Sequence, residues 1–351
     1  MVAFARNVVR MALGRGSSLR APSSYSGQLM FEGMPMLGLG LAALGRPGYI
    51  NLNRAADLGD NENNDGPSPR SQEGMRANAF EVLDVAYARG VRYFDCAASY
   101  GLSEKFLAAW LKERKIAPGG DLVVGSKWGY VYKAGWQIEV PEGGAHEVKD
   151  HSLNNLISQA CTSNNILGEH LNMLQIHSAT LESGVLDDWT IVDRLVRMRT
   201  HHGWRIGLTL SGPTQASTLA KAMEVGIFDC VQATYNVMEQ SAGPALVAAQ
   251  QAGMEVIVKE ALGNGRVLSL PPLVAMAERL GTTPDALALA AVLAQPFQPL
   301  VLSGAVSSNQ IESNANSLDL ELPNDDLALL LDACRVDPAD YWTERSDLQW
   351  N

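Results

Sequence analysis

The stretch Val91–Leu111 reads VRYFDCAASYGLSEKFLAAWL and combines a strand, a loop and a helix in one segment. Its first part, Val91–Ala97, is a short apolar run of the kind that forms buried strands. After a short loop, Ser103–Lys115 carries apolar residues at helical spacing, begins with Ser-Glu and ends before Pro118. Val91–Leu111 is therefore predicted to be one β/α unit, and repetition of that unit predicts a parallel sheet.

The unit recurs along the chain as apolar runs that alternate with amphipathic segments. The eight runs predicted to be strands are Met36–Leu41, Val91–Ala97, Asp121–Lys127, Asn172–His177, Trp204–Leu210, Phe228–Thr234, Met254–Glu260 and Pro299–Ser303. The segments predicted to be helices are Met75–Ala88, Ser103–Lys115, Ser152–Leu167, Pro213–Val225, Ser241–Ala252 and Thr283–Ala294. Glycine follows several of these segments, as is common at helix C-termini.

Eight alternating strands and helices predict an α/β protein with a (β/α)8 fold, the TIM barrel. In such a barrel the active site lies at the carboxyl ends of the strands. The alternative is an open, doubly wound sheet, which has about six strands and a glycine fingerprint after the first one. Gly38, Gly40 and Gly45 occur near the first predicted strand, but their spacing does not fit G-x-G-x-x-G.

The composition suits one large globular domain, because 46% of the residues are hydrophobic and 19% are charged. The net charge of −11 argues against nucleic acid or an anionic membrane as a partner, since both attract basic surfaces. No stretch has the roughly 18 uninterrupted apolar residues of a membrane span. The four cysteines, Cys96, Cys161, Cys230 and Cys334, are scattered, so we expect reduced and mostly buried thiols.

The predicted barrel domain, residues 31–351, follows an N-terminal extension of residues 1–30. Arginines recur through this extension among apolar and serine residues, and the first acidic residue is Glu32. That composition is typical of a mitochondrial or plastid transit peptide; the alternative is a disordered basic tail on a cytoplasmic protein. Within the barrel domain, the polar segment Asn51–Gly74 predicts a long surface loop, and after Leu330 the chain leaves the repeat.

Four polar residues occur at the predicted carboxyl ends of successive strands. Asp95 ends the second strand and Tyr100 lies in the loop before the next helix. Lys127 ends the third strand and His177 ends the fourth. Because these ends meet at one mouth of a barrel, we expect the four side chains to lie together.

These residue types suit delivery of a proton to a carbonyl oxygen. A free tyrosine, with a pKa of about 10, is a poor acid at neutral pH. A neighbouring ammonium lowers that pKa, so we expect Lys127 to activate Tyr100 and Asp95 to hold Lys127 in place. His177 would orient the carbonyl or relay the proton.

The sequence resembles the aldo-keto reductases over about Met34 to Leu318. The motifs that carry the resemblance are FD-(x)4-YG-x-SE at Phe94–Glu104, Lys127 at a strand end, IH at Ile176–His177, VQ-(x)2-YN at Val231–Asn236 and SG-(x)5-Q-(x)3-N at Ser303–Asn314. The resemblance implies a (β/α)8 barrel that reduces aldehydes or ketones, or oxidises sugar lactols, with NADPH or NADH. It also implies that Asp95, Tyr100, Lys127 and His177 are the catalytic tetrad, with Tyr100 as the acid.

The resemblance also implies a set of coenzyme-binding residues, with some departures from the family's pattern. Gln232 matches the glutamine that binds the carboxamide, Thr209 replaces a serine there, and Leu210 replaces an asparagine. Lys259 stands where an aromatic ring usually stacks on the nicotinamide. In Glu260–Arg266, Gly265 and Arg266 are expected to approach the pyrophosphate, or else the segment is a tight turn.

The segment after the eighth strand is where the family binds the adenosine 2′-phosphate. Its residues expected at the coenzyme are Ser303, Gly304, Ser307, Gln310 and Asn314. Ser303–Asn314 contains no Lys or Arg. We therefore expect NADP to be used with NAD as an alternative and with weak discrimination between them.

Two functions remain open from sequence: a working reductase or dehydrogenase, and a nucleotide-binding regulatory barrel with little turnover. The expected partner is a small carbonyl compound or sugar, and the expected oligomeric state is a monomer. No HExxH or Cys/His cluster indicates a metal. The aromatic residues expected to wall the mouth are Trp128, Tyr130, Tyr132 and Trp136, with Tyr341, Trp342 and Trp350 from the C-terminal tail.

Overall fold

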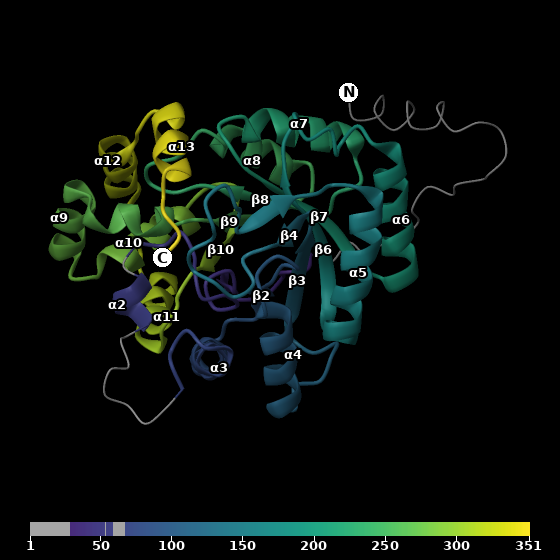
Figure 1. The fold of residues 1–351 in the computed structure, drawn as a ribbon. Helices are drawn as coiled ribbons and strands as arrows, with labels where there is room; N and C mark the ends of the chain where they lie inside the picture. The colour runs from purple at the N-terminus through teal and green to yellow at the C-terminus, as the bar shows by residue number, and fades with distance from the viewer. Residues whose placement is uncertain (1–28, 53, 59–66) are drawn as a thin grey trace.

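Eight parallel strands close into a barrel in the computed structural model, which describes residues 29–52, 54–58 and 67–351 (Figure 1). Around the barrel the strands follow the order β1–β10–β9–β8–β7–β6–β3–β2. Their bounds are β1 (Leu37–Gly40), β2 (Tyr93–Asp95), β3 (Val123–Trp128), β6 (Leu171–Ala179), β7 (Arg205–Leu210), β8 (Cys230–Thr234), β9 (Glu255–Lys259) and β10 (Leu300–Ser303). The predicted TIM barrel is confirmed.

Helices surround the barrel and connect its strands, as Figure 1 shows. The connecting helices are α3 (Gln72–Ala88), α4 (Ser103–Glu113), α5 (Leu153–Leu167), α6 (Trp189–His202), α7 (Gln215–Val225), α8 (Gly243–Gln251), α9 (Pro271–Leu280) and α10 (Pro284–Leu293), and α11 (Ser308–Ala315) follows the last strand. Local signals set several of their ends: the hydroxyl of Ser152 accepts from Asn155 N at the start of α5, and Gly226 ends α7 in a left-handed conformation.

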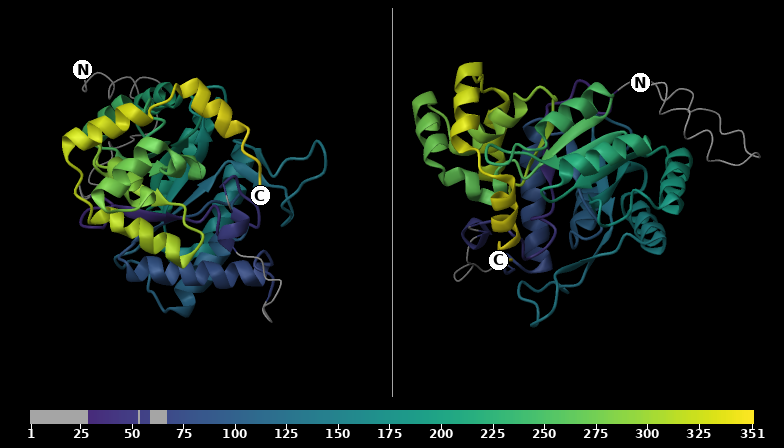
Figure 2. Two further views of the ribbon diagram at one scale, coloured as in Figure 1. Left: turned by 90° about the vertical axis from the view of Figure 1, so that its left-hand side faces the viewer. Right: turned by 90° about the horizontal axis from the view of Figure 1, so that it is seen from above.

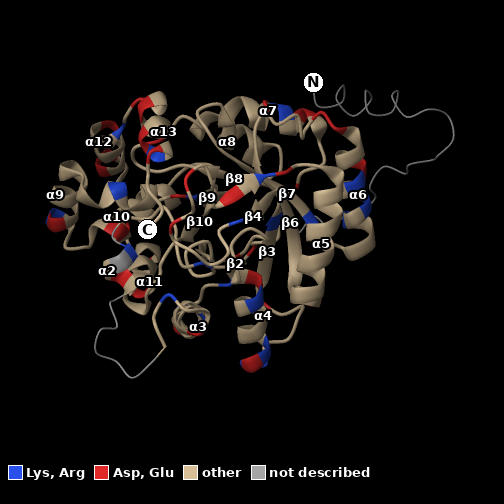
Figure 3. Cartoon of the chain, in the orientation of Figure 1, with Lys and Arg blue, Asp and Glu red and all other residues tan. Residues whose placement is uncertain are grey.

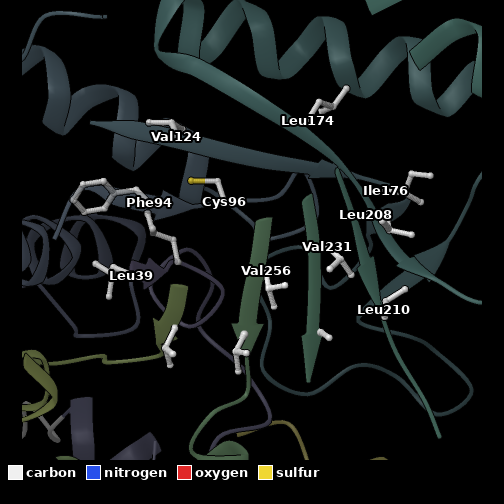
Figure 4. Packing of buried hydrophobic residues seen from close by; sticks show 14 of the residues in the cluster. Leu39, Phe94, Cys96, Val124, Leu174, Ile176, Leu208, Leu210, Val231 and Val256 are labelled. Atoms are coloured by element: carbon white, nitrogen blue, oxygen red, sulfur yellow. The ribbon is translucent and has the colours of Figure 1, made fainter. Parts of the chain in front are cut away.

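Alternate strand residues point outward and form the main core between barrel and helices (Figure 4). Leu39, Phe94, Val124, Leu174 and Val231, all at or near 0% exposure, belong to this layer. Because side chains alternate along a strand, the residues between them point into the barrel. This alternation fixes which polar residues can reach the interior.

The interior of the barrel is filled by a smaller apolar cluster that includes Tyr93, Met173, Cys230 and Ile257. Phe31 joins this cluster, and its ring centre lies 5.2 Å from that of Tyr93. The backbone N–H of Phe31 donates to Glu255 at the start of β9. The cluster closes the amino end of the barrel, so the interior polar groups gather toward the carboxyl end.

Two parts of the chain depart from the simple alternation. A two-stranded antiparallel hairpin, β4 (Tyr130–Tyr132) and β5 (Glu147–Lys149), lies between β3 and α5. In the predicted surface loop Asn51–Gly74, a short helix α2 (Arg54–Leu58) is present, so that prediction was wrong for this part. The physical reason is Arg54, which is buried and donates to Arg46 O at 2.7 Å.

The C-terminal segment adds two helices beyond the repeat, α12 (Asn324–Cys334) and α13 (Pro338–Ser346). Tyr341 and Trp342 on α13 are buried and pack with α9 and α10. After α13 the chain returns toward the barrel, and its end lies beside the loop before β5 (Figure 2). Asn351 N donates to Tyr49 O at 3.0 Å and Tyr49 N donates to Asn351 O at 3.2 Å, so the end of the chain is pinned to the loop after β1.

The remaining sequence expectations concern the extension, the thiols and the surface. Residues 1–28 of the predicted extension lie outside the described residues. Cys96, Cys230 and Cys334 are free and buried, and Cys161 is free and exposed. On the face drawn in Figure 3, acidic and basic residues are interspersed over the outer helices. In the described part of the chain, no helix combines the length and the apolar character that crossing a membrane requires.

Candidate active site

A cavity of about 690 Å³ opens at the carboxyl ends of the barrel strands. Its wall includes Asp95, Tyr100 and His177 on one side and Lys259 and Ser303 on the other. The N-terminal loops and the C-terminal segment complete its rim. In a TIM barrel this is the end where active sites occur.

An ion pair between Lys127 and Asp95 lies beneath the cavity. Asp95 ends β2 and Lys127 is near the end of the neighbouring strand β3, so barrel geometry brings the two residues together. Their side chains are 2% exposed or less. The Lys127 ammonium also donates to Cys96 O at 2.9 Å. Burial of both charges makes the pair depend on complete hydrogen bonding.

The second oxygen of Asp95, Oδ1, accepts three further hydrogen bonds inside the barrel. Tyr93 Oη donates at 2.8 Å, Gln232 Nε2 at 3.1 Å and Gln175 Nε2 at 3.2 Å. The close approach of Tyr93 requires glycine on the next strand, because a Cβ at Gly125 would lie 2.4 Å from Tyr93 Oη. These bonds fix the carboxylate that in turn holds Lys127.

Tyr100 lies in the loop between β2 and α4, above the Lys127–Asp95 pair. Its Oη is 3.4 Å from Nε2 of His177, which β6 supplies. The Lys127 Nζ lies 4.7 Å from the centre of the Tyr100 ring. Ser99 Oγ lies 3.4 Å from the other ring nitrogen of His177. The four residues predicted to form the catalytic group are thus brought together around one wall of the cavity.

The pKa values of this group are governed by burial. Burial raises the pKa of Tyr100 well above its usual 10, and the Asp95 charge adds to this shift. Arg46 lowers the pKa of Tyr100, but burial outweighs it, so the net shift is upward and not the lowered pKa that was expected. Burial and then Lys127 lower the pKa of His177 well below its usual value, so the imidazole is neutral at pH 7.

Arg46 is a further residue of this wall that the sequence did not reveal. It lies after β1, is 2% exposed, and its NH1 donates to Glu147 Oε2 at 2.8 Å. Its guanidinium carbon is 5.1 Å from the centre of the Tyr100 ring and 4.6 Å from that of Trp350. The local sequence signal for this residue was a single arginine inside the apolar stretch LGLAALGRPGY. This pattern does not indicate which residues the arginine contacts.

The opposite wall contains most of the residues expected to bind coenzyme. Those that line the cavity are Gln232, Lys259, Gly265, Ser303, Gly304, Gln310 and Asn314. Ser303 and Asn314 are joined by a hydrogen bond of 2.8 Å. Asp57 and Asp285 line the same cavity.

Three of the expected coenzyme residues do not line the cavity. Thr209 is buried and its hydroxyl accepts from Ser178 N at 2.7 Å. Arg266 turns toward α13, where its guanidinium carbon lies 4.1 Å from the Tyr341 ring centre. The hydroxyl of Ser307 caps α11. In each case the polar group that was expected to bind the coenzyme instead contacts a neighbouring part of the protein.

Lys259 and Glu260, at the end of β9, form a charged cluster with Arg345 of the tail. Lys259 Nζ donates to Thr234 Oγ1 at 2.7 Å and lies 3.9 Å from Glu260 Oε1. Arg345 donates to Glu260 through both Nε and NH2, the shortest contact being 2.5 Å. Burial lowers the pKa of Lys259 to about 8. Burial raises the pKa of Glu260, but Arg345 and Lys259 outweigh it and bring the value to about 2.

The aromatic wall differs from the one expected. Trp128 is fully buried in the core and Trp136 donates to Arg70 O at 2.8 Å, so the prediction was wrong for these two residues. Tyr130 lines the cavity and its ring centre is 5.0 Å from that of His177. Trp350 also lines the cavity and stacks on His146, with ring centres 4.1 Å apart.

Tyr132, Tyr341 and Trp342 do not line the cavity, although all three were expected at the mouth. Tyr341 instead accepts a hydrogen bond from Asn236 Nδ2 at 2.9 Å within the core. Of the tail aromatics that were expected there, Trp350 is therefore the residue that reaches the cavity. The structure also shows no group of three or more His, Cys, Asp or Glu side chains arranged for a metal ion within the residues it describes.

Residues 66–334, more than half of the chain, match the model of the aldo/keto reductase family. The chain belongs to this family. No curated protein matches it. Among solved structures, an aldo/keto reductase from Klebsiella pneumoniae in complex with NADP and acetate is 19% identical, with a TM-score of 0.59 over 85% of this chain and 90% of that one.

A second aldo-keto reductase from Klebsiella pneumoniae, in complex with NADPH, is 18% identical. Its TM-score is 0.61 over 87% of this chain and 93% of that chain. At such identities the likeness establishes the barrel fold. Membership of the family makes the chain an oxidoreductase that acts on small molecules.

Proposed function

We propose that this aldo/keto reductase reduces aldehydes or ketones, and oxidises the corresponding alcohols or sugar lactols, by hydride exchange with NADP(H). The observation that carries the proposal is the placement of Tyr100 Oη beside His177 Nε2, above a buried Lys127–Asp95 pair, in the wall of the cavity. A carbonyl oxygen placed between the two side chains meets a proton donor and a second polar group at once.

Tyr100 is the proton donor in this proposal. Its raised pKa keeps the phenol protonated at neutral pH but makes it a weak acid, so proton donation depends on stabilisation of the phenolate as it forms. As the proton leaves, negative charge develops on Tyr100, and the Lys127 and Arg46 cations near its ring stabilise that charge. Asp95 acts indirectly, by holding Lys127 beneath the ring.

His177 orients the carbonyl oxygen. With its pKa lowered, the ring is neutral and one of its nitrogens carries a hydrogen. Ser99 Oγ can donate to Nδ1, which leaves the hydrogen on Nε2, the nitrogen that faces Tyr100. His177 then donates to the substrate oxygen while Tyr100 supplies the proton.

The residues of the opposite wall fit a dinucleotide. An added Cβ at Gly304 would meet no atom within 4 Å, which leaves open space beside the N-terminus of α11 for a phosphate or ribose. Asn264 Oδ1 is buried without a hydrogen-bond partner in the described part of the chain, and Asn264 lines the cavity. Gln232 would hold the carboxamide. Bound NADPH supplies the hydride. Klebsiella pneumoniae relatives that bind NADP or NADPH support this choice of coenzyme.

The substrate class follows from the rim. Tyr130, His146 and Trp350 line the cavity and provide flat apolar faces with polar edges, which suit sugars and aromatic aldehydes. The test is NADPH oxidation with a panel of aldoses, aromatic aldehydes and ketones. Turnover of at least one class supports the proposal. Binding of NADPH without turnover of any class would point to a regulatory nucleotide-binding barrel instead.

A further inference from the structure

Lys259 is a cation in the cavity wall that the proposed mechanism does not use. It ends β9, lines the cavity, and has a side chain 15% exposed. Its Nζ is held in place by a hydrogen bond to Thr234 Oγ1 on the neighbouring strand, to which Lys259 is paired in register. A fixed and largely desolvated ammonium therefore lies in the wall of the cavity.

The charge of Lys259 is not fully offset by its surroundings. The other cations of this region each have a carboxylate: Lys127 has Asp95, Arg46 has Glu147 and Arg345 has Glu260. Glu260 lies 3.9 Å from Lys259 but is bonded directly to Arg345. Lys259, Glu260 and Arg345 together carry two positive charges and one negative, so the cluster has a net charge of about +1 when all three are ionised.

The nicotinamide must lie within reach of this charge if the proposed function is correct. Hydride and proton reach the two atoms of one C–O bond, so the ring must lie beside Tyr100. Lys259 belongs to the same electrostatic group, because its charge lowers the pKa of His177, and Lys127 and Asp95 act on its own pKa. Low exposure limits the screening of these interactions by water.

We propose, on the basis of the proposed function, that Lys259 discriminates between the two redox states of the coenzyme. The oxidised nicotinamide ring carries a positive charge and the reduced ring is neutral. The ammonium of Lys259 therefore repels the oxidised ring and leaves the reduced ring unaffected. The ratio of dissociation constants Kd(NADP⁺)/Kd(NADPH) is therefore larger than it would be with a neutral residue at this position. On the enzyme, this bias favours hydride acceptance and hence substrate oxidation.

The bias depends on pH in a defined direction. The ionisable groups that act on Lys259 are Glu260 on the same strand end, Arg345 on α13, Lys127 on β3 and Asp95 on β2. Burial and these groups together place the pKa of Lys259 near 8. Above that pH the amine is neutral, the repulsion disappears and NADP⁺ binding should tighten, whereas NADPH binding should not change.

The experiment measures dissociation constants of NADP⁺ and NADPH by titration calorimetry at pH 7, without substrate. We expect Lys259→Met to lower the ratio Kd(NADP⁺)/Kd(NADPH) by about tenfold, the order expected for one partly screened charge. Lys259→Arg keeps the charge and should keep the ratio. Lys221→Met removes a surface lysine on α7 that pairs with Asp187 and should also keep it.

A titration of the wild-type protein from pH 7 to 9.5 tests the same idea without a variant. The 2′-phosphate, with its second pKa near 6, does not titrate in this range, so it affects both coenzymes equally. A fall of the ratio across pH 8 supports the proposal. If both coenzymes bind but the ratio Kd(NADP⁺)/Kd(NADPH) is unchanged in Lys259→Met or across pH 8, the proposed role of Lys259 is wrong. Failure of the wild type to bind either form overturns the proposed function as well.

Discussion

The two walls of the cavity hold their charged groups in different ways. In the wall formed by β2, β3 and β6, the pair of Lys127 and Asp95 is fixed by neighbouring strands of one sheet. In the wall that includes the end of β9, Glu260 is paired with Arg345 of the C-terminal segment, 85 residues away. Strand register therefore determines the positions of the charged groups in the first wall, whereas those in the second wall depend on packing of the C-terminal segment against the barrel.

The residues proposed to carry out proton transfer and those expected to select coenzyme and substrate therefore lie on different walls. The proposed proton donor and the residues that support it belong to the wall set by strand register, where a small displacement would impair the proposed reaction. Groups expected to choose coenzyme and substrate belong to the wall and rim that loops and the tail complete. Variants of the first wall should therefore reduce turnover, and variants of the second should mainly change affinity and preference.

The largest expected effect is that of removing the proposed proton donor. Tyr100→Phe should lower carbonyl reduction by roughly three orders of magnitude or more and leave NADPH affinity unchanged, because only the donated proton is lost. Steady-state NADPH oxidation and a fluorescence titration measure the two quantities. Tyr132→Phe, in the hairpin but outside the cavity, is the matched control and should resemble wild type. Activity of Tyr100→Phe within tenfold of wild type would remove this residue from the mechanism.

The first wall could be predicted from sequence because it depends on local signals. Strand position places Asp95, Lys127 and His177 at one end of the barrel, and the alternation of apolar residues fixes which faces are inward. The eight predicted strands overlap the observed ones within a few residues at each end. Strand and helix order therefore determined both the fold and this part of the site.

The rest of the site depends on contacts that no local pattern records. Tyr93 and Gln175 read as ordinary strand residues, and their hydrogen bonds to Asp95 appear only when the barrel closes. Arg345 lies in the C-terminal segment, outside the β/α repeat, so the repeat does not predict its position. Arg266 was expected to bind phosphate, but its guanidinium contacts Tyr341 on α13. The hairpin β4–β5 has strands of three residues each, too short for a periodic signal.

The second expected effect is on stability. Lys127→Met leaves the buried carboxylate of Asp95 without its cation and should lower the free energy of unfolding by about 3–5 kcal/mol. The double variant Lys127→Met with Asp95→Asn removes both charges and should regain most of that stability without regaining activity. Urea unfolding measures the free energies and NADPH oxidation measures the activity. A single variant as stable as wild type would show that the pair is not needed for folding.

The third prediction concerns the rim, where the tail meets the cavity. Trp350→Ala should raise KM about two- to tenfold and change kcat less than twofold, since one aromatic contact contributes about 0.5–1.5 kcal/mol. Truncation before Tyr341 is a poorer test, because Tyr341 is fully buried. Trp189→Ala on α6, 61% exposed, is the matched control. Kinetics equal to wild type in Trp350→Ala would mean that substrate does not reach the tail.

The last comparison concerns the choice between NADPH and NADH, where we expect only weak discrimination. The cavity is lined beside α11 by Gln310 and Asn314, with Asp57 and Asp285 among its other lining residues, and the described segment 303–314 carries no Lys or Arg. Neutral donors can bind either a phosphate or a ribose hydroxyl, and carboxylates disfavour the phosphate. We therefore expect an NADPH preference in kcat/KM below about a hundredfold, with little dependence on salt.

A designed cation should sharpen that preference if the adenosine end lies beside α11. Gln310→Arg places a positive charge in the lining and should raise the preference for NADPH about tenfold, an effect that salt should weaken. Ser313→Arg adds the same charge to α11 outside the lining and should have little effect. A strong, salt-sensitive NADPH preference already present in the wild type would contradict this reading, because a cation from another part of the chain would then have to reach the phosphate. The tail would be the first place to seek it, since it already supplies Arg345 to the cavity wall.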